Sequence, residues 1–108
     1  MLETIINGIK YEIIDCNTFI KKLVGLMFKK EKIDNIYHFP KCSSIHTFFM
    51  FQSIDICMTD KDNKIVYLKE NLSPWKIIWP RKKAYHTYEM PLNTSKYLNI
   101  NQIFKINS

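Results

Sequence analysis

The side chains best able to do chemistry in this chain stand close together in the segment CSSIHTFFMFQSIDICMTD, residues 42–60. Cys42, His46 and Asp55 lie there among eight large apolar residues. A thiol beside an imidazole is a nucleophile with its base, and a carboxylate adds a general base or a metal ligand. The segment is therefore either a site or a pair of buried strands that tolerates a few polar residues.

A metal site is the first possibility, because His38, Cys42 and His46 follow one another at intervals of four residues. On a helix this spacing would align three metal ligands on one face. Pro40 interrupts any helix through this stretch, and a zinc site would need a fourth ligand such as Asp55. The spacing therefore favours coincidence, and we predict neither a metal nor another cofactor.

A cysteine nucleophile is the second possibility. Cys42 and His46 are separated by a loop-to-strand junction, so they need not touch, and no oxyanion hole or third orienting group accompanies them. The pattern is more typical of a small buried thiol and a hydrogen-bonded histidine. We therefore predict no catalytic residues and favour a protein that is not an enzyme.

Asp55 is the least expected of the three, since an aspartate between Ile54 and Ile56 disfavours a strand. Two interpretations stay open. In the structural one, the carboxylate accepts hydrogen bonds from Thr47, from His46 or from backbone amides at a bulge around residues 52–53. In the functional one, it lines a pocket beside His46. We favour the structural interpretation.

Composition is typical of a compact protein. A chain of 108 residues makes one domain, 1–108, and a hydrophobic content of 46% argues against disorder. Apolar runs stay shorter than the ~18 residues of a membrane span, and the N-terminus lacks the features of a secretory signal. Three cysteines without CxxC spacing argue against a disulfide framework. We expect a single soluble domain in the reducing cytoplasm.

The basic charge gives a weaker indication of a partner. The net charge is +6, yet fifteen of the sixteen basic residues are lysine and only Arg81 is arginine. Recognition of phosphates and bases usually depends on the forked donors of arginine, so a solvated lysine surface is favoured. Residues 74–88, PWKIIWPRKKAYHTY, nevertheless interleave aromatic and basic side chains, as single-strand binding platforms do. Weak nucleic-acid binding therefore stays as an alternative.

The spacing of apolar residues predicts a β-rich α+β domain. Asn7-Gly8 between two β-branched runs indicates a hairpin with a type I′ turn. Residues 17–24 repeat apolar side chains at three- and four-residue steps, as a short amphipathic helix does. Residues 29–44 are interpreted as a linker with at most a brief strand at 36–39. Strands are predicted over residues 2–6, 9–14, 45–51, 54–60, 64–70 and 84–90, and at the end near 102–106. We expect a sandwich or a distorted barrel.

Several of these segments together resemble one family. Lys22 precedes a Gly-Leu-Met run at 25–27, and the segments CSSIHTFFM, IDICMTDKDNKIV, NLSPWK and YEMPLNT follow in order. From about residue 16 onward the chain resembles the bacterial and archaeal domain of unknown function 192 (DUF 192). The resemblance implies a compact, mostly β domain with a short helix at the Gly-Leu-Met run, and it implies no established activity.

The resemblance marks a candidate cluster for binding a ligand, whose members are Lys22, Cys42, His46, Thr47, Met50 and Asp55. Members of the family usually have arginine at the place of Lys22 and glycine at the place of Asn93. They also have Arg-Phe-Pro where this chain has residues 51–53, and many have Gly-Asp near residues 101–102.

Three classes of function follow from these observations. We predict a small non-catalytic module that binds a ligand or a protein. The first alternative is a weak nucleic-acid-binding domain. The second is an enzyme or metal protein centred on Cys42, His46 and Asp55.

Overall fold

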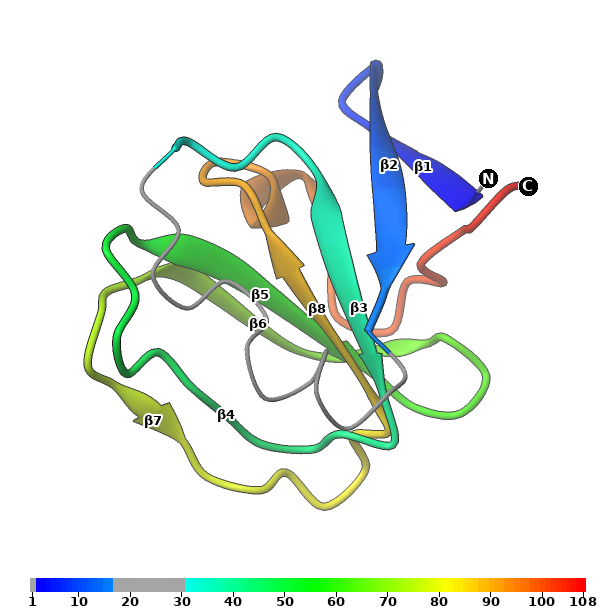
Figure 1. The fold of residues 1–108 in the computed structure, drawn as a ribbon. Helices are drawn as coiled ribbons and strands as arrows, with labels where there is room; N and C mark the ends of the chain where they lie inside the picture. The colour runs from blue at the N-terminus through cyan, green and yellow to red at the C-terminus, as the bar shows by residue number, and fades with distance from the viewer. Residues whose placement is uncertain (1, 17–30) are drawn as a thin grey trace.

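The computed structural model of the protein describes residues 2–16 and 31–108 and consists mainly of strands (Figure 1). Six strands form one mixed sheet in the order β1-β2-β3-β8-β5-β6, and β4 pairs with β7 in a separate ribbon. The elements are β1 (Leu2–Ile6), β2 (Ile9–Asp15), β3 (Ile36–Pro40), β4 (Ile45–His46), β5 (Ile54–Thr59), β6 (Ile65–Leu72), β7 (Ile77–Ile78), β8 (His86–Met90) and the 3₁₀ turn η1 (Ser95–Tyr97).

The first two strands form the predicted hairpin. Asn7 and Gly8 have φ angles of 52° and 76°, and both lie in the left-handed region that a type I′ turn requires. β2 then pairs with β3 in parallel, over three residue pairs that end at Asp15 and His38. The other pairs in the sheet are antiparallel. The hairpin thus joins the rest of the sheet through a short parallel contact.

Apolar side chains cover both faces of the sheet. One layer contains Tyr88 and Phe104, and the other contains Ile56, Met58 and Ile78. All six residues of β5 are buried, because this strand lies between the two layers. Ile78 belongs to β7, so the β4–β7 ribbon packs on the second layer, far from the β1–β2 hairpin in Figure 1.

The β-rich prediction is confirmed, while the barrel is not. Within the described residues, β1 pairs only with β2, and β6 pairs only with β5, among the strands. The main sheet is therefore open at both edges. A sandwich-like arrangement of an open sheet and a small ribbon describes it better.

The strand predicted over residues 45–51 is wrong beyond His46. The amide of Met50 bonds the carbonyl of Thr47 at 3.3 Å, and Phe49 has a φ angle of 64°. The chain turns here because the polar groups of Thr47 bond residues 73–76 instead of a neighbouring strand. The apolar run therefore forms a turn, although it has the composition of a buried strand.

Three other predictions have different outcomes. The brief strand that the sequence allows at residues 36–39 is present as β3, but it is a central strand between β2 and β8 where a peripheral part of a linker was expected. The terminal segment makes only isolated bridges, at Ile103 and Asn107, so the predicted final strand is wrong. The helix predicted over residues 17–24 lies outside the described residues.

Candidate functional site

Thr47 is the member of the predicted cluster that organises the β4–β7 ribbon. Its buried hydroxyl donates to the carbonyl of Ser73 at 2.7 Å and accepts from the amide of Lys76 at 2.9 Å. Its carbonyl also accepts from the amide of Trp75 at 2.9 Å. These bonds fix the loop before β7, so Thr47 determines where Trp75 and Lys76 stand on the surface.

Cys42 and His46 have separate environments. The Cys42 thiol donates to the carbonyl of Ser44 at 3.0 Å, while the exposed His46 accepts from the amide of Phe48 through Nδ1 at 3.3 Å. The hydroxyl of Thr87 donates to the Cys42 carbonyl at 2.9 Å, which ties this loop to β8. Among the described contacts, thiol and imidazole share no hydrogen bond, and a nucleophile–base pair would need one.

Asp55 is buried in a set of main-chain donors. One carboxylate oxygen accepts from the amide of Asn71 at 2.9 Å. The other accepts from the amides of Thr94 and Ser95 at 3.1 and 3.0 Å, and from the Ser95 hydroxyl at 2.8 Å. Backbone amides therefore satisfy the carboxylate, but they belong to residues 71, 94 and 95. The carboxylate does not use the amides expected at a bulge around residues 52–53, nor the side chains of Thr47 and His46. Asp55 holds η1 against the end of β6.

The remaining members of the cluster are Met50 and Lys22. Met50 is buried in the second apolar layer, and Lys22 lies outside the described residues. Within residues 2–16 and 31–108, no three His, Cys, Asp or Glu side chains gather as a metal site requires. The structure therefore groups Thr47 with the surface around Trp75, and it places Asp55 in the interior with different partners.

A concave surface beside this ribbon is a groove between β6 and β7. It has a volume of about 420 Å³, and its walls include the cations of Lys69, Lys76 and Arg81 together with the rings of Tyr67 and Trp79. None of its lining residues is an aspartate or a glutamate. The Arg81 guanidinium lies 4.1 Å from the centre of the Tyr67 ring. We call this surface the basic groove.

Aromatic side chains also gather around Trp75, the residue before Lys76. The Trp75 ring stacks on the Phe48 ring, with centroids 5.8 Å apart, and makes an edge contact with the Phe49 ring, with centroids 4.9 Å apart. Phe49 and Trp75 have φ angles of 64° and 62°, which is unusual for bulky residues. Such backbone strain persists only where surrounding contacts impose it, and it is common at functional sites. Here the hydrogen bonds of Thr47 impose it.

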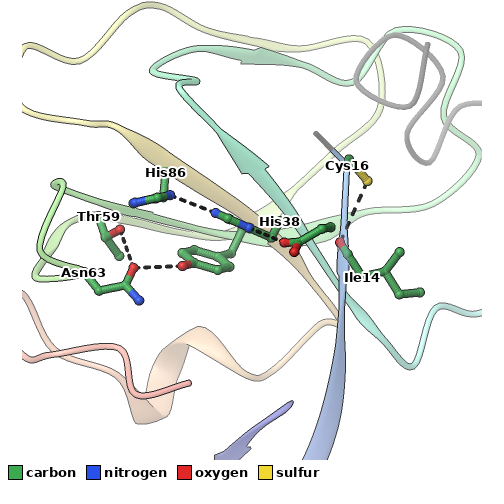
Figure 2. Close-up of polar contacts among 8 residues, drawn as sticks. Ile14, Cys16, His38, Thr59, Asn63 and His86 are labelled. Carbon is green, nitrogen blue, oxygen red and sulfur yellow. Dashed lines mark hydrogen bonds and ion pairs between the residues drawn. The ribbon is translucent and has the colours of Figure 1, made fainter. Parts of the chain in front are cut away.

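Sequence reasoning missed a row of polar side chains on β2, β3 and β8 (Figure 2). His38 hydrogen-bonds Asp15 through Nδ1, and its Nε2 lies 2.8 Å from Nδ1 of His86. The His38 ring also stacks on Tyr88, with centroids 4.8 Å apart. Burial and the neighbouring His38 charge hold the pKa of His86 below its usual 6.5. The residues are far apart in sequence, so no spacing in the chain could have indicated this row.

Glu89 is a further titratable group that the sequence did not single out. It lies on β8 opposite Tyr37 and Ile56 and is only 5% exposed. Burial raises its pKa from 4.5 to about 8, so the carboxyl group keeps its proton at neutral pH.

Comparison with known proteins agrees with these features of the fold. The model of the family DUF192, described as "Uncharacterized ACR", matches residues 3–106. The chain belongs to the DUF192 family. A UPF0127 protein of Pyrococcus horikoshii is 37% identical over 79 residues, which cover 69% of this chain and 68% of the relative. A UPF0127 protein of Pyrococcus abyssi is 34% identical over 95 residues, covering 84% of this chain and 79% of the relative.

Two solved structures share the fold at 15% sequence identity. A protein of unknown function from Novosphingobium aromaticivorans superposes with a TM-score of 0.76, covering 99% of this chain and 83% of the other. A Sinorhizobium meliloti protein, described as a candidate transcription regulator, gives a TM-score of 0.77 and covers 98% and 90%. At this identity the likeness concerns the fold alone. No helix in the described part of this DUF192 member is long and apolar enough to cross a membrane.

Proposed function

We propose that the protein is a non-catalytic binding module whose basic groove takes a small anionic ligand that carries a flat ring. The observation that carries this proposal is the lining of the groove, which combines three cations and two aromatic rings without a carboxylate. A lining with three cations and no carboxylate attracts anions.

The side chains of the groove suit the two parts of such a ligand. The guanidinium of Arg81 can form paired hydrogen bonds with a carboxylate or a phosphate, while Lys69 and Lys76 add charge. The Trp79 side chain is 72% exposed, so its face is open for stacking by a planar group. The position of Lys76 follows from its bond to Thr47, which links the predicted signature to this groove.

The composition of the lining also supports binding without chemistry. None of the lining residues is His, Cys, Asp or Glu, the side chains that most often act as general acids, bases or thiol nucleophiles. Cys42 and Cys57 are both free thiols, which supports a location in the reducing cytoplasm.

Tryptophan fluorescence tests the proposal with three probes: adenosine monophosphate, adenosine and inorganic phosphate. We expect the nucleotide to bind more tightly than either part alone, since it uses the cations and the rings together. Lys76→Ala and Arg81→Ala should each weaken the nucleotide by at least about tenfold, the loss of one charge-assisted hydrogen bond. Lys105→Ala, an exposed lysine elsewhere, is the matched control and should bind as the wild type does. Equal losses in all three variants would refute the groove.

Single-stranded nucleic acid is a second candidate, favoured by the exposure of Trp75 and Trp79, which are 59% and 72% exposed. Lys82 and Lys83 are exposed in the same segment. If a strand binds, an oligothymidine should bind more tightly as salt falls, and Lys82→Ala with Lys83→Ala should reduce that slope. If the mononucleotide binds tightly and binds this double variant as well as it binds the wild type, the result favours a small ligand over a nucleic-acid strand.

A further inference from the structure

The row Asp15–His38–His86 crosses three neighbouring strands at one end of the sheet. Asp15 and His38 are the last pair in the parallel register of β2 and β3, and the next amide, that of Cys16, donates to the His38 carbonyl at 2.8 Å. His86 begins β8 on the other side of His38, and Figure 2 shows the two imidazoles facing each other. The side chains thus connect β2 to β8 through β3.

The number of protons in this row is limited by geometry. An ionised Asp15 only accepts, so Nδ1 of His38 carries a hydrogen. The contact between His38 Nε2 and His86 Nδ1 needs one N–H and one lone pair. The two rings together therefore hold at most one positive charge while this contact exists. A second charge would place two N–H groups against each other.

We propose that Asp15, His38 and His86 form a proton-controlled clamp, which is closed while one imidazole stays neutral and opens when both are charged. The clamp is independent of the basic groove, because it uses different strands and different side chains. It would respond to acidification around the histidine range, where few other side chains change their charge.

The surroundings of the clamp favour the closed form at neutral pH. The charged groups that act on His86 are His38 on β3, Asp15 on β2 and Asp60 after β5, and the backbone of Lys61 hydrogen-bonds it. The rings of Tyr85 and Tyr88 lie beside it in its own segment. Burial and His38 lower the pKa of His86, while the Lys61 backbone, Asp60 and Asp15 raise it less. The His86 imidazole is protonated near pH 6.5 in the unfolded chain and only at lower pH in the folded state. The contribution of His86 to the free energy of unfolding is therefore complete above pH 6.5, and it is lost as pH falls.

The segment most affected by opening is the attachment of the β1–β2 hairpin. β2 and β3 pair over only three residues, and the clamp lies at one end of this pairing. Loss of the side-chain contacts there removes support from the amides of Asp15 and Cys16. We therefore expect acid to loosen the β2–β3 junction before the antiparallel core.

Imidazole resonances in nuclear magnetic resonance spectra test the clamp, since the chain has three histidines. In the wild type, His86 should titrate below 6.5, and in His38→Gln its pKa should move up because the neighbouring charge is gone. His46→Gln is the matched control, because His46 is exposed on β4 and should leave His86 unchanged. If His38→Gln does not fold, His86→Gln replaces it in the exchange experiment below, with the same expected result. Independent titration of both rings would overturn the proposal.

Amide hydrogen exchange provides the second readout. After correction for the intrinsic effect of pH, the Cys16 amide should lose protection between neutral and acid pH in the wild type, while the β5–β8 amides keep theirs. The loss should be smaller in His38→Gln, where a neutral amide faces His86. An equal loss in both proteins, or none in either, would contradict a clamp controlled by the histidine pair.

Discussion

Replacing Asp55 by alanine is the perturbation that best separates folding from function in residues 42–60. The carboxylate accepts from the amides of Asn71, Thr94 and Ser95. Thr94 and Ser95 are each only 2% exposed, so in Asp55→Ala two backbone donors lose their partner away from water. Each unpaired buried donor costs about 1–3 kcal/mol, which gives a loss of about 2–6 kcal/mol in the free energy of unfolding.

Urea denaturation of a small series measures this loss. Asp55→Asn keeps one acceptor oxygen, which can serve the Thr94–Ser95 side or the Asn71 side but not both. The free energy of unfolding of Asp55→Asn should therefore fall by less than that of Asp55→Ala, by about 1–3 kcal/mol. Asp62→Ala is the control, because Asp62 is an exposed carboxylate and its removal should change stability by no more than about 0.5 kcal/mol.

A structural role of Asp55 is supported if the loss of stability is largest in Asp55→Ala, smaller in Asp55→Asn and smallest in the control Asp62→Ala. An Asp55→Ala midpoint equal to the wild type, or above it, would refute the reasoning. It would mean that the carboxylate is kept at a cost to stability, as groups in binding sites often are, and that the buried end of β5 has a functional role.

Substitutions at three further positions test other parts of the fold. The free energy of unfolding of Glu89→Gln, relative to that of the wild type, should rise by about 3 kcal/mol between about pH 5 and pH 8. Urea denaturation of the two proteins at each pH measures this difference. Burial raises the pKa of Glu89 from 4.5 to about 8, so wild-type stability falls as pH rises through this window, and parallel profiles would contradict it. Thr47→Val removes the hydroxyl that bonds Ser73 and Lys76, so it should lower the free energy of unfolding by about 1–3 kcal/mol and change the tryptophan fluorescence. An unchanged fluorescence spectrum would contradict the conclusion that Thr47 positions Trp75. Gly8→Ala should cost about 1 kcal/mol at its φ of 76°, and Gly8→Asn less, by thermal denaturation; equal melting temperatures would reject the turn argument.

Local signals predicted the parts of the fold whose contacts are close in sequence. Asn7-Gly8 can adopt positive φ angles cheaply, so the β1–β2 hairpin followed from two residues and their flanks. The β5–β6 turn is similar, since Asp60 accepts from the amides of Asp62 and Lys64 within its own loop. Both turns are determined by short-range sterics and hydrogen bonding.

The same local reasoning failed where distant residues decide. The run after His46 has the composition of a buried strand, but Thr47 bonds residues 73–76 and the chain turns. The sequence allows only a brief strand at residues 36–39, and it does not show that this strand is central, because its parallel partner, β2, lies more than twenty residues earlier, as the pair Asp15–His38 shows. Alternation patterns report which face is apolar, and they do not report which strand will be the neighbour.

The sequence by itself determined the β-rich class, the N-terminal hairpin and membership of DUF192, because composition, turn residues and motif order are properties of the linear chain. The tertiary structure alone decided which chemical groups meet. Asp55 reaches donors about forty residues away, and His38 meets His86 across 48 residues. The basic groove likewise exists only where β6 and β7 come together. A hydrogen bond or a cavity depends on positions in space, and chain spacing does not encode these until the sheet has assembled.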